Sequence, residues 1–124
     1  MNGKFLLDTN AVIALLNGNA ALQSLLLSAN WVGISVITEL EFLAFPNLSS
    51  NDSVLFRRFK QRVEVIGIDA SDTAFLEQTI QIRRDFNVKL PDAVVATTAL
   101  QNQSTLLSND AVFRRLPMLS LQNF

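Results

Sequence analysis

The chain has 124 residues, of which 49% are hydrophobic, a formal net charge of −1, and neither histidine nor cysteine. These absences exclude a Ser-His-Asp triad, a thiolate zinc site, a disulfide and a cysteine nucleophile, and the net charge argues against a protein that coats nucleic acid. We expect one soluble, cytoplasmic domain over residues 1–124, because the length suits one domain, no leader is evident, and no apolar run approaches the ~18 residues that span a membrane.

Apolar and β-branched runs predict strands, and caps, glycine and proline bound the helices between them. The first half predicts a strand over Lys4–Leu7, helices over 9–17 and 20–29, a strand over Trp31–Ser35, a helix over 36–45 before Pro46, a polar loop over 46–51 and a basic helix to about Arg62. The second half predicts a strand over 63–68, a helix from the N-cap Ser71 to Phe86, a connection over 87–90, a helix from Pro91 to about Asn102, a strand over 105–108, a short helix over 110–115 and a last strand over 118–121. This alternation predicts a single three-layer α/β/α domain with a central parallel sheet.

Four acidic residues lie at the edges of apolar segments. Asp8 follows the first strand, Asp110 follows the strand over 105–108, Asp92 begins a helix after Pro91, and Glu41 lies in the helix after the second strand. In open parallel sheets, ligands gather beyond the carboxyl ends of the strands. We therefore expect the four acids to converge on one pocket of oxygen ligands, which suits Mg²⁺ or Mn²⁺.

Three of the four acids also have a purely structural explanation. Asp8 and Asp110 are good caps for the helices that follow them, and Asp92 complements its helix dipole. Helical angle does not distinguish Glu41 from Glu39, because both lie at margins between two apolar faces. At an effective dielectric of about 20, one pair of carboxylates ~4 Å apart repels by ~4 kcal/mol. A gathered set therefore requires a cation or a shifted pKa.

The helix over 36–45 is apolar on two sides. Its main stripe is expected to face the core and comprises Val36, Ile37, Leu40, Leu43 and Ala44. Phe42 and Phe45 form a second apolar face, which we expect to be a homodimer interface, with burial inside the monomer as the alternative.

Basic residues form three groups, for each of which a solvated helix face is the ordinary explanation. The groups are Arg57, Arg58, Lys60 and Arg62; Arg83, Arg84 and Lys89; and Arg114 and Arg115. Three such groups around one acidic pocket would favour a functional explanation over a solvated face.

The four acidic segments resemble those of the PIN-domain nucleases, in particular the VapC-type toxins of bacterial toxin–antitoxin modules. LLDTNAVIAL at 6–15 looks like the family's opening strand, with its acid at Asp8. ISVITELE at 34–41 is similar to the family's Thr-x-x-Glu segment, which selects Glu41 over Glu39. LPDAVVA at 90–96 places the third acid at Asp92, and TLLSND at 105–110 places the fourth at Asp110.

By that resemblance, the chain would be an Mg²⁺-dependent endoribonuclease, the toxin of a pair, with RNA as substrate and a small antitoxin protein as partner. Asp8, Asp92 and Asp110 would hold Mg²⁺ directly or through water, with Mn²⁺ as an alternative and no organic cofactor. Glu41 would orient or deprotonate the attacking water, or serve as a further ligand. Two other residues are candidates for positioning the phosphate or the acids: Asn10 and Ser108.

Three other classes share parts of this pattern. Haloacid-dehalogenase-like phosphatases carry a second acid two residues after the first, where this chain has Asn10. Response-regulator receivers need a lysine after a late strand, whereas Lys89 here precedes a helix. A catalytically degenerate PIN-like domain that only binds RNA or protein is the remaining alternative, and the four retained acids count against it.

Overall fold

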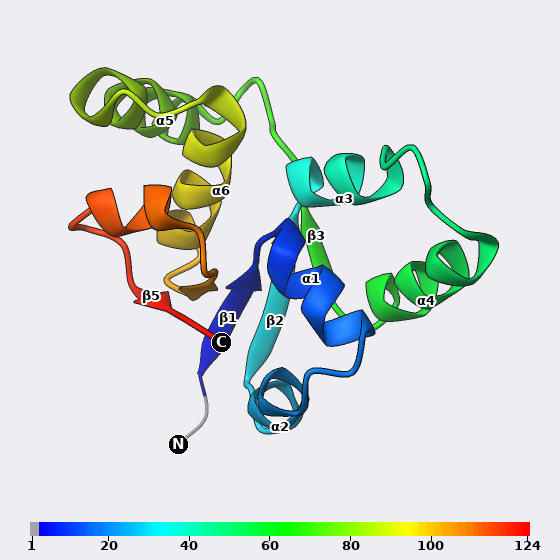
Figure 1. Cartoon of the computed structure of the whole chain (residues 1–124). Coiled ribbons are helices and arrows are strands. Elements are labelled where there is room, and N and C mark those ends of the chain that lie inside the picture. The colour runs from blue at the N-terminus through cyan, green and yellow to red at the C-terminus, as the bar shows by residue number, and fades with distance from the viewer. Residues whose placement is uncertain (1–2) are drawn as a thin grey trace.

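A computed structural model of the chain describes residues 3–124. At its centre is a five-stranded sheet in the order β3-β2-β1-β4-β5, in which every pairing is parallel. The strands are β1 (Lys4–Leu7), β2 (Trp31–Ser35), β3 (Glu64–Ile66), β4 (Thr105–Leu107) and β5 (Leu121–Gln122). The first strand therefore occupies the middle of the sheet, so the residues that follow it are flanked on both sides (Figure 1).

Helices cover both faces of this sheet. They are α1 (Thr9–Leu16), α2 (Ala20–Leu27), α3 (Val36–Leu43), α4 (Ser50–Lys60), α5 (Thr73–Phe86), α6 (Leu90–Gln101) and the 3-10 helix η1 (Ala111–Arg115). In Figure 1, α5, α6 and η1 lie on the left of the sheet, α1 and α4 lie on the right, and α2 lies at the bottom. The predicted three-layer α/β/α architecture with a parallel sheet is confirmed.

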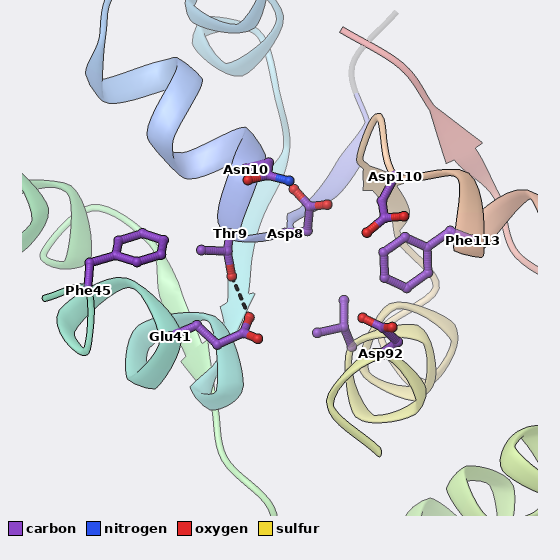
Figure 2. Close-up of a pocket in the computed structure, with 9 residues that line it drawn as sticks. Asp8, Thr9, Asn10, Glu41, Phe45, Asp92, Asp110 and Phe113 are labelled. Carbon is purple, nitrogen blue, oxygen red and sulfur yellow. Dashed lines mark hydrogen bonds between the residues drawn. The ribbon is translucent and has the colours of Figure 1, made fainter. Parts of the chain in front are cut away.

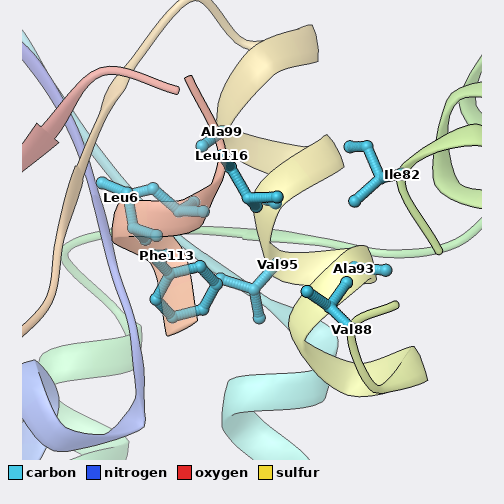
Figure 3. Close-up of a cluster of buried hydrophobic side chains, with 10 residues drawn as sticks. Leu6, Ile82, Val88, Ala93, Val95, Ala99, Phe113 and Leu116 are labelled. Carbon is cyan, nitrogen blue, oxygen red and sulfur yellow. The ribbon is translucent and has the colours of Figure 1, made fainter. Parts of the chain in front are cut away.

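Two hydrophobic clusters hold the layers together, one on each face. Alternate residues of a strand point to opposite faces, so Leu6 of β1 packs with α6, while Phe5 and Leu7 pack with α1 and α2. The cluster on the α6 face contains Ile82, Val88, Ala93, Val95, Ala96, Ala99, Leu106, Phe113 and Leu116 as well as Leu6 (Figure 3). This cluster fixes the end of α5, the start of α6 and η1 against one another.

Several predicted bounds need correction. The helix to Phe86 begins at Thr73 with Asp72 as its N-cap, because the Ser71 hydroxyl instead donates to Asp69. The last strand is Leu121–Gln122 and not 118–121, and the strand expected over 63–68 is only Glu64–Ile66. The prediction of a break at Gly18 is confirmed, since its φ of +91° is a conformation that glycine adopts without strain.

The packing of α3 reverses the expected orientation. Phe42 is only 4% exposed and stacks on Phe56 of α4, with ring centroids 4.7 Å apart. Leu40 and Leu43, expected in the core stripe, are 60% and 41% exposed. Burial inside the monomer, the alternative to a homodimer interface, is therefore correct for Phe42, whereas Phe45 of the same predicted face is 41% exposed.

Trp31, the chain's single tryptophan, lies at the amino end of β2. Its indole covers Gly33, where an added Cβ would come within 2.3 Å of the ring, so only glycine fits beneath it. The indole nitrogen donates to Glu64 of β3 at 3.2 Å, and the Lys4 ammonium lies 5.3 Å from the ring centroid. These contacts join three strands at the amino edge of the sheet.

Among the described residues, no single helix is long and apolar enough to cross a membrane. Of the helices in residues 3–124, only α1 and α2 taken together would be long and apolar enough, and the chain bends by 101° between these two helices.

Candidate active site

A pocket of about 230 Å³ lies beyond the carboxyl ends of β1, β2 and β4. All four predicted acids line it, although each comes from a different part of the chain. The complete lining is Asp8, Thr9, Asn10, Glu41, Phe45, Asp92, Val95, Asp110 and Phe113. Figure 2 shows Glu41 on one side of this space and Asp92 and Asp110 on the other, with Asp8 between them. The structure thus brings together the acids that the parallel topology predicts.

Asp8 is the most buried of the four, with 7% of its surface exposed. One carboxylate oxygen caps α1 by accepting from the Ala11 amide at 2.8 Å, and the other accepts from the Ser108 hydroxyl. Burial raises the pKa of Asp8, the two hydrogen bonds lower it, and the charges of Asp110 and Glu41 raise it further. Its capping role and its place in the pocket are therefore compatible, since each oxygen retains a free lone pair.

Ser108 forms hydrogen bonds with two of the acidic residues, Asp8 and Asp110. Besides donating to Asp8, its buried hydroxyl accepts from the backbone amide of Asp110 at 3.0 Å. Asp110 also caps η1, because its side chain accepts from the Val112 amide at 3.1 Å. These contacts are those expected of a residue that positions the acids, which is one of the two roles predicted for Ser108. Asn10, the other candidate, lines the pocket directly.

The two glutamates of α3 have separate surroundings. Glu41 accepts a hydrogen bond from the Thr9 hydroxyl at 2.6 Å and lines the pocket. Glu39 instead forms a salt bridge with Lys60 of α4 at 2.6 Å. Contacts outside α3 therefore distinguish two residues that helical angle alone does not.

Asp92 stands in the first turn of α6, a helix buried over Ala93–Ala99. Burial raises the pKa of Asp92, as do the nearby charges of Asp110 and Glu41, and Lys89 partly offsets them. For both Asp8 and Asp92 burial is the largest cause that raises the pKa, and the neighbouring carboxylates add the electrostatic cost predicted from the sequence. That cost is the kind that a bound cation removes.

The donor set suits a hard divalent cation, because carboxylate oxygens select Mg²⁺ or Mn²⁺ over softer metals. Among residues 3–124, no three acidic side chains come together closely enough to hold one ion. Mg²⁺ commonly binds through one or two carboxylates and keeps several waters for which substrate phosphates can exchange. The pocket therefore fits an ion that keeps part of its hydration shell.

Four of the lining residues were not predicted as site residues: Thr9, Phe45, Val95 and Phe113. Thr9 follows Asp8 directly, so its hydroxyl was the one signal in the sequence that could have identified it. Phe45 was expected at a homodimer interface, but it lies at the pocket with 41% of its surface exposed.

Comparison with known proteins gives the same picture of the fold. The family model described as PIN domain matches residues 5–119. No curated protein sequence matches the chain. A chain of the toxin-antitoxin complex from Klebsiella pneumoniae is 25% identical, with a TM-score of 0.74 and coverage of 92% of this chain and 93% of that one.

Two further solved structures share the fold at lower identity. A chain in VapBC2 from Rickettsia felis, bound to a promoter DNA fragment, is 23% identical, with a TM-score of 0.78 and 98% of both chains covered. A chain in DNA-bound VapBC from Salmonella typhimurium is 24% identical, with a TM-score of 0.78 and coverage of 99% of this chain and 98% of that one.

Proposed function

Because this chain belongs to the PIN-domain family, we propose that it is a metal-dependent endoribonuclease and the toxin of a toxin–antitoxin pair. The observation that carries the proposal is the pocket lined by four carboxylates from four separate segments, at the carboxyl edge of a parallel sheet. That edge is where open α/β sheets bind ligands. RNA, and not DNA, is taken as the substrate from the family likeness.

A divalent cation, Mg²⁺ in this proposal, supplies a Lewis acid for the scissile phosphate and a lower pKa for the attacking water. Asp8, Asp92 and Asp110 would hold it, directly or through water. Asp8 is suited to this because Ser108 and the Ala11 amide fix both of its oxygens. Fixed ligands need no reorganisation when charge develops in the transition state.

Glu41 is the candidate general base, or the group that orients the attacking water. It is more accessible than Asp8 and faces the same pocket from the opposite side to Asp92 and Asp110 (Figure 2). The hydroxyl of Thr9 holds one of its carboxylate oxygens at 2.6 Å and leaves the other free of hydrogen bonds from the described residues. A carboxylate held in this way is oriented without being neutralised.

The partner in this proposal is a small antitoxin protein. The Klebsiella pneumoniae structure is a toxin-antitoxin complex, and the likeness to one of its chains extends over more than nine-tenths of both. A homodimer remains a prediction for which α3 no longer supplies the expected face.

The test is cleavage of single-stranded RNA and DNA by the purified chain, with and without Mg²⁺. Asp92→Asn and Glu41→Gln should each abolish Mg²⁺-dependent RNA cleavage. Glu39→Gln is the matched control. It removes the same charge from the same helix, but Glu39 pairs with Lys60 and does not line the pocket. Wild-type cleavage that persists in Asp92→Asn would contradict the assignment. A folded wild type that binds RNA but never cleaves it would support the degenerate binding module instead.

A further inference from the structure

Five of the chain's ten basic residues gather at one end of the α6 layer: Arg83, Arg84, Lys89, Arg114 and Arg115. The fold brings the segment 83–89 together with η1. Arg115 of η1 donates to the carbonyl of Phe86, which lies between Arg84 and Lys89 in the sequence. Arg83 donates to the carbonyl of Val88 at 3.3 Å. Beneath them, Ile82, Val88 and Phe113 belong to one buried cluster (Figure 3). We call these five residues the basic rim.

No residue of the basic rim forms a salt bridge within the part of the chain that the structure describes, and only Lys89 acts by its charge on a pocket acid, Asp92. All five residues are exposed, and the salt bridge between Lys60 and Glu39 is the only one over residues 3–124. Asp85, the acid inside the rim's own sequence, accepts a hydrogen bond from Gln81. Five like charges that have no salt-bridge partner repel one another, so an external anion would stabilise the arrangement.

The rim borders one side of the acidic pocket. Lys89 is the N-cap residue of α6, whose first turn carries Asp92, and its side chain makes no capping hydrogen bond. Arg114 directly follows Phe113, which lines the pocket beside Asp110 (Figure 2). A polyanion repelled by the pocket carboxylates would therefore meet its nearest positive charge on this side.

We propose that the basic rim binds the phosphates of the RNA strand that flank the scissile phosphate. This inference rests on the proposed function and names where its substrate lies. Guanidinium groups suit phosphate because they offer paired donors, and such contacts fix the register of a strand without reading its bases. On the other side of the pocket, by contrast, Lys60 of the α4 basic group is already paired with Glu39.

The experiment measures binding of fluorescein-labelled single-stranded RNA in EDTA, where the cation needed for cleavage is absent, over a series of salt concentrations. The rim variant is Lys89→Gln with Arg114→Gln, because neither side chain makes a hydrogen bond to the described residues. The control is Lys4→Gln with Arg62→Gln. Lys4 begins β1 and Arg62 precedes β3, so both lie at the amino edge of the sheet, opposite the pocket.

We expect the rim variant to bind several-fold more weakly than the control at low salt. Each phosphate-binding charge that is removed should reduce the slope of log K against log salt by about 0.7 for a single strand, hence by about 1.4 for two. Lys89→Arg with Arg114→Lys keeps both charges and should restore the wild-type slope. Circular dichroism would establish that all variants fold alike.

Three outcomes would overturn the proposal. If wild type cleaves RNA while the rim and control variants share one affinity and one slope, the rim is not the phosphate site and the proposed function stands. If wild type neither binds nor cleaves RNA, the proposed function fails as well. If the rim variant binds RNA normally but no longer binds the partner antitoxin, the rim is a protein interface.

Discussion

Replacing Thr9 with valine would remove one hydroxyl from the pocket while keeping the shape of the side chain. That hydroxyl donates to Glu41 at 2.6 Å, the short distance typical of a hydrogen bond to a charged acceptor. Hydrogen bonds to charged groups contribute about 1.5–3 kcal/mol in favourable settings. Glu41 is exposed, so solvent competition reduces the value here to about 0.5–1 kcal/mol. If all of it orients the general base, kcat should fall about two- to fivefold.

The assay is steady-state cleavage of a short RNA, with kcat and KM determined separately. KM should stay near the wild-type value, because Thr9 acts through Glu41 and not on the strand. Thr9→Ser keeps the hydroxyl and should restore most of kcat. The free energy of unfolding in urea should change by less than about 1 kcal/mol, as is usual for a single exposed hydrogen bond.

A double-mutant cycle tests the reasoning most sharply. Glu41→Asp withdraws the carboxylate from Thr9 while keeping its charge, so Thr9→Val should have no further effect in that background. If Thr9→Val slows cleavage equally with either acid at position 41, Thr9 does not act by positioning Glu41. A Thr9→Ser variant as slow as Thr9→Val would refute the hydrogen-bond argument independently.

The remaining predictions concern stability and metal. Because burial raises the pKa of Asp92 above the 3.8 of an ordinary aspartate, the folded metal-free protein binds protons more tightly than the unfolded chain. Raising the pH from the pKa of Asp92 in the unfolded chain to its higher pKa in the folded protein should therefore destabilise wild type relative to Asp92→Asn. Urea unfolding of both proteins at successive pH values measures the difference. Mg²⁺ at a hundred times its Kd should stabilise the folded chain by about 2.7 kcal/mol, and Asp8→Asn should lose most of the resulting rise in Tm; equal rises would remove Asp8 from the metal site. Phe42→Ala should lower the free energy of unfolding by about 3–5 kcal/mol, because Phe42 stacks on Phe56. Leu40→Ala should change it by less than about 0.5 kcal/mol. Similar losses for the two variants in urea unfolding would contradict the orientation of α3.

The sequence predicts those features that depend on local pattern and on general rules of topology. The runs before Asp8 and before Val36 are short and mostly apolar, the second of them with β-branched Val32 and Ile34, and both strands have the predicted bounds. Parallel pairing then places the ends of β1, β2 and β4 at one edge. Convergence of the four acids follows from that rule without any knowledge of distances.

The sequence does not predict features that depend on contacts between distant segments. The sequence pattern favours burial of the five-residue stripe of α3, but stacking on Phe56 of α4 buries Phe42 instead. Likewise, Thr9 and Lys60 separate Glu41 from Glu39, although both lie more than 20 positions away from their partner. The N-cap at Asp72 was mispredicted for a local reason, since the Ser71 hydroxyl has a competing acceptor in Asp69.

The position of Trp31 gives the chain an intrinsic fluorescent probe that lies far from the acidic pocket. The indole packs on Gly33 at the amino edge of the sheet, whereas the acids lie beyond the carboxyl edge. Unfolding should expose the ring and shift its emission to longer wavelength, so tryptophan fluorescence follows loss of the β1–β2–β3 register without added label. Binding of Mg²⁺ or RNA should leave that emission unchanged. An emission shift on ligand addition to the folded protein would therefore report a rearrangement transmitted along the length of the central strands.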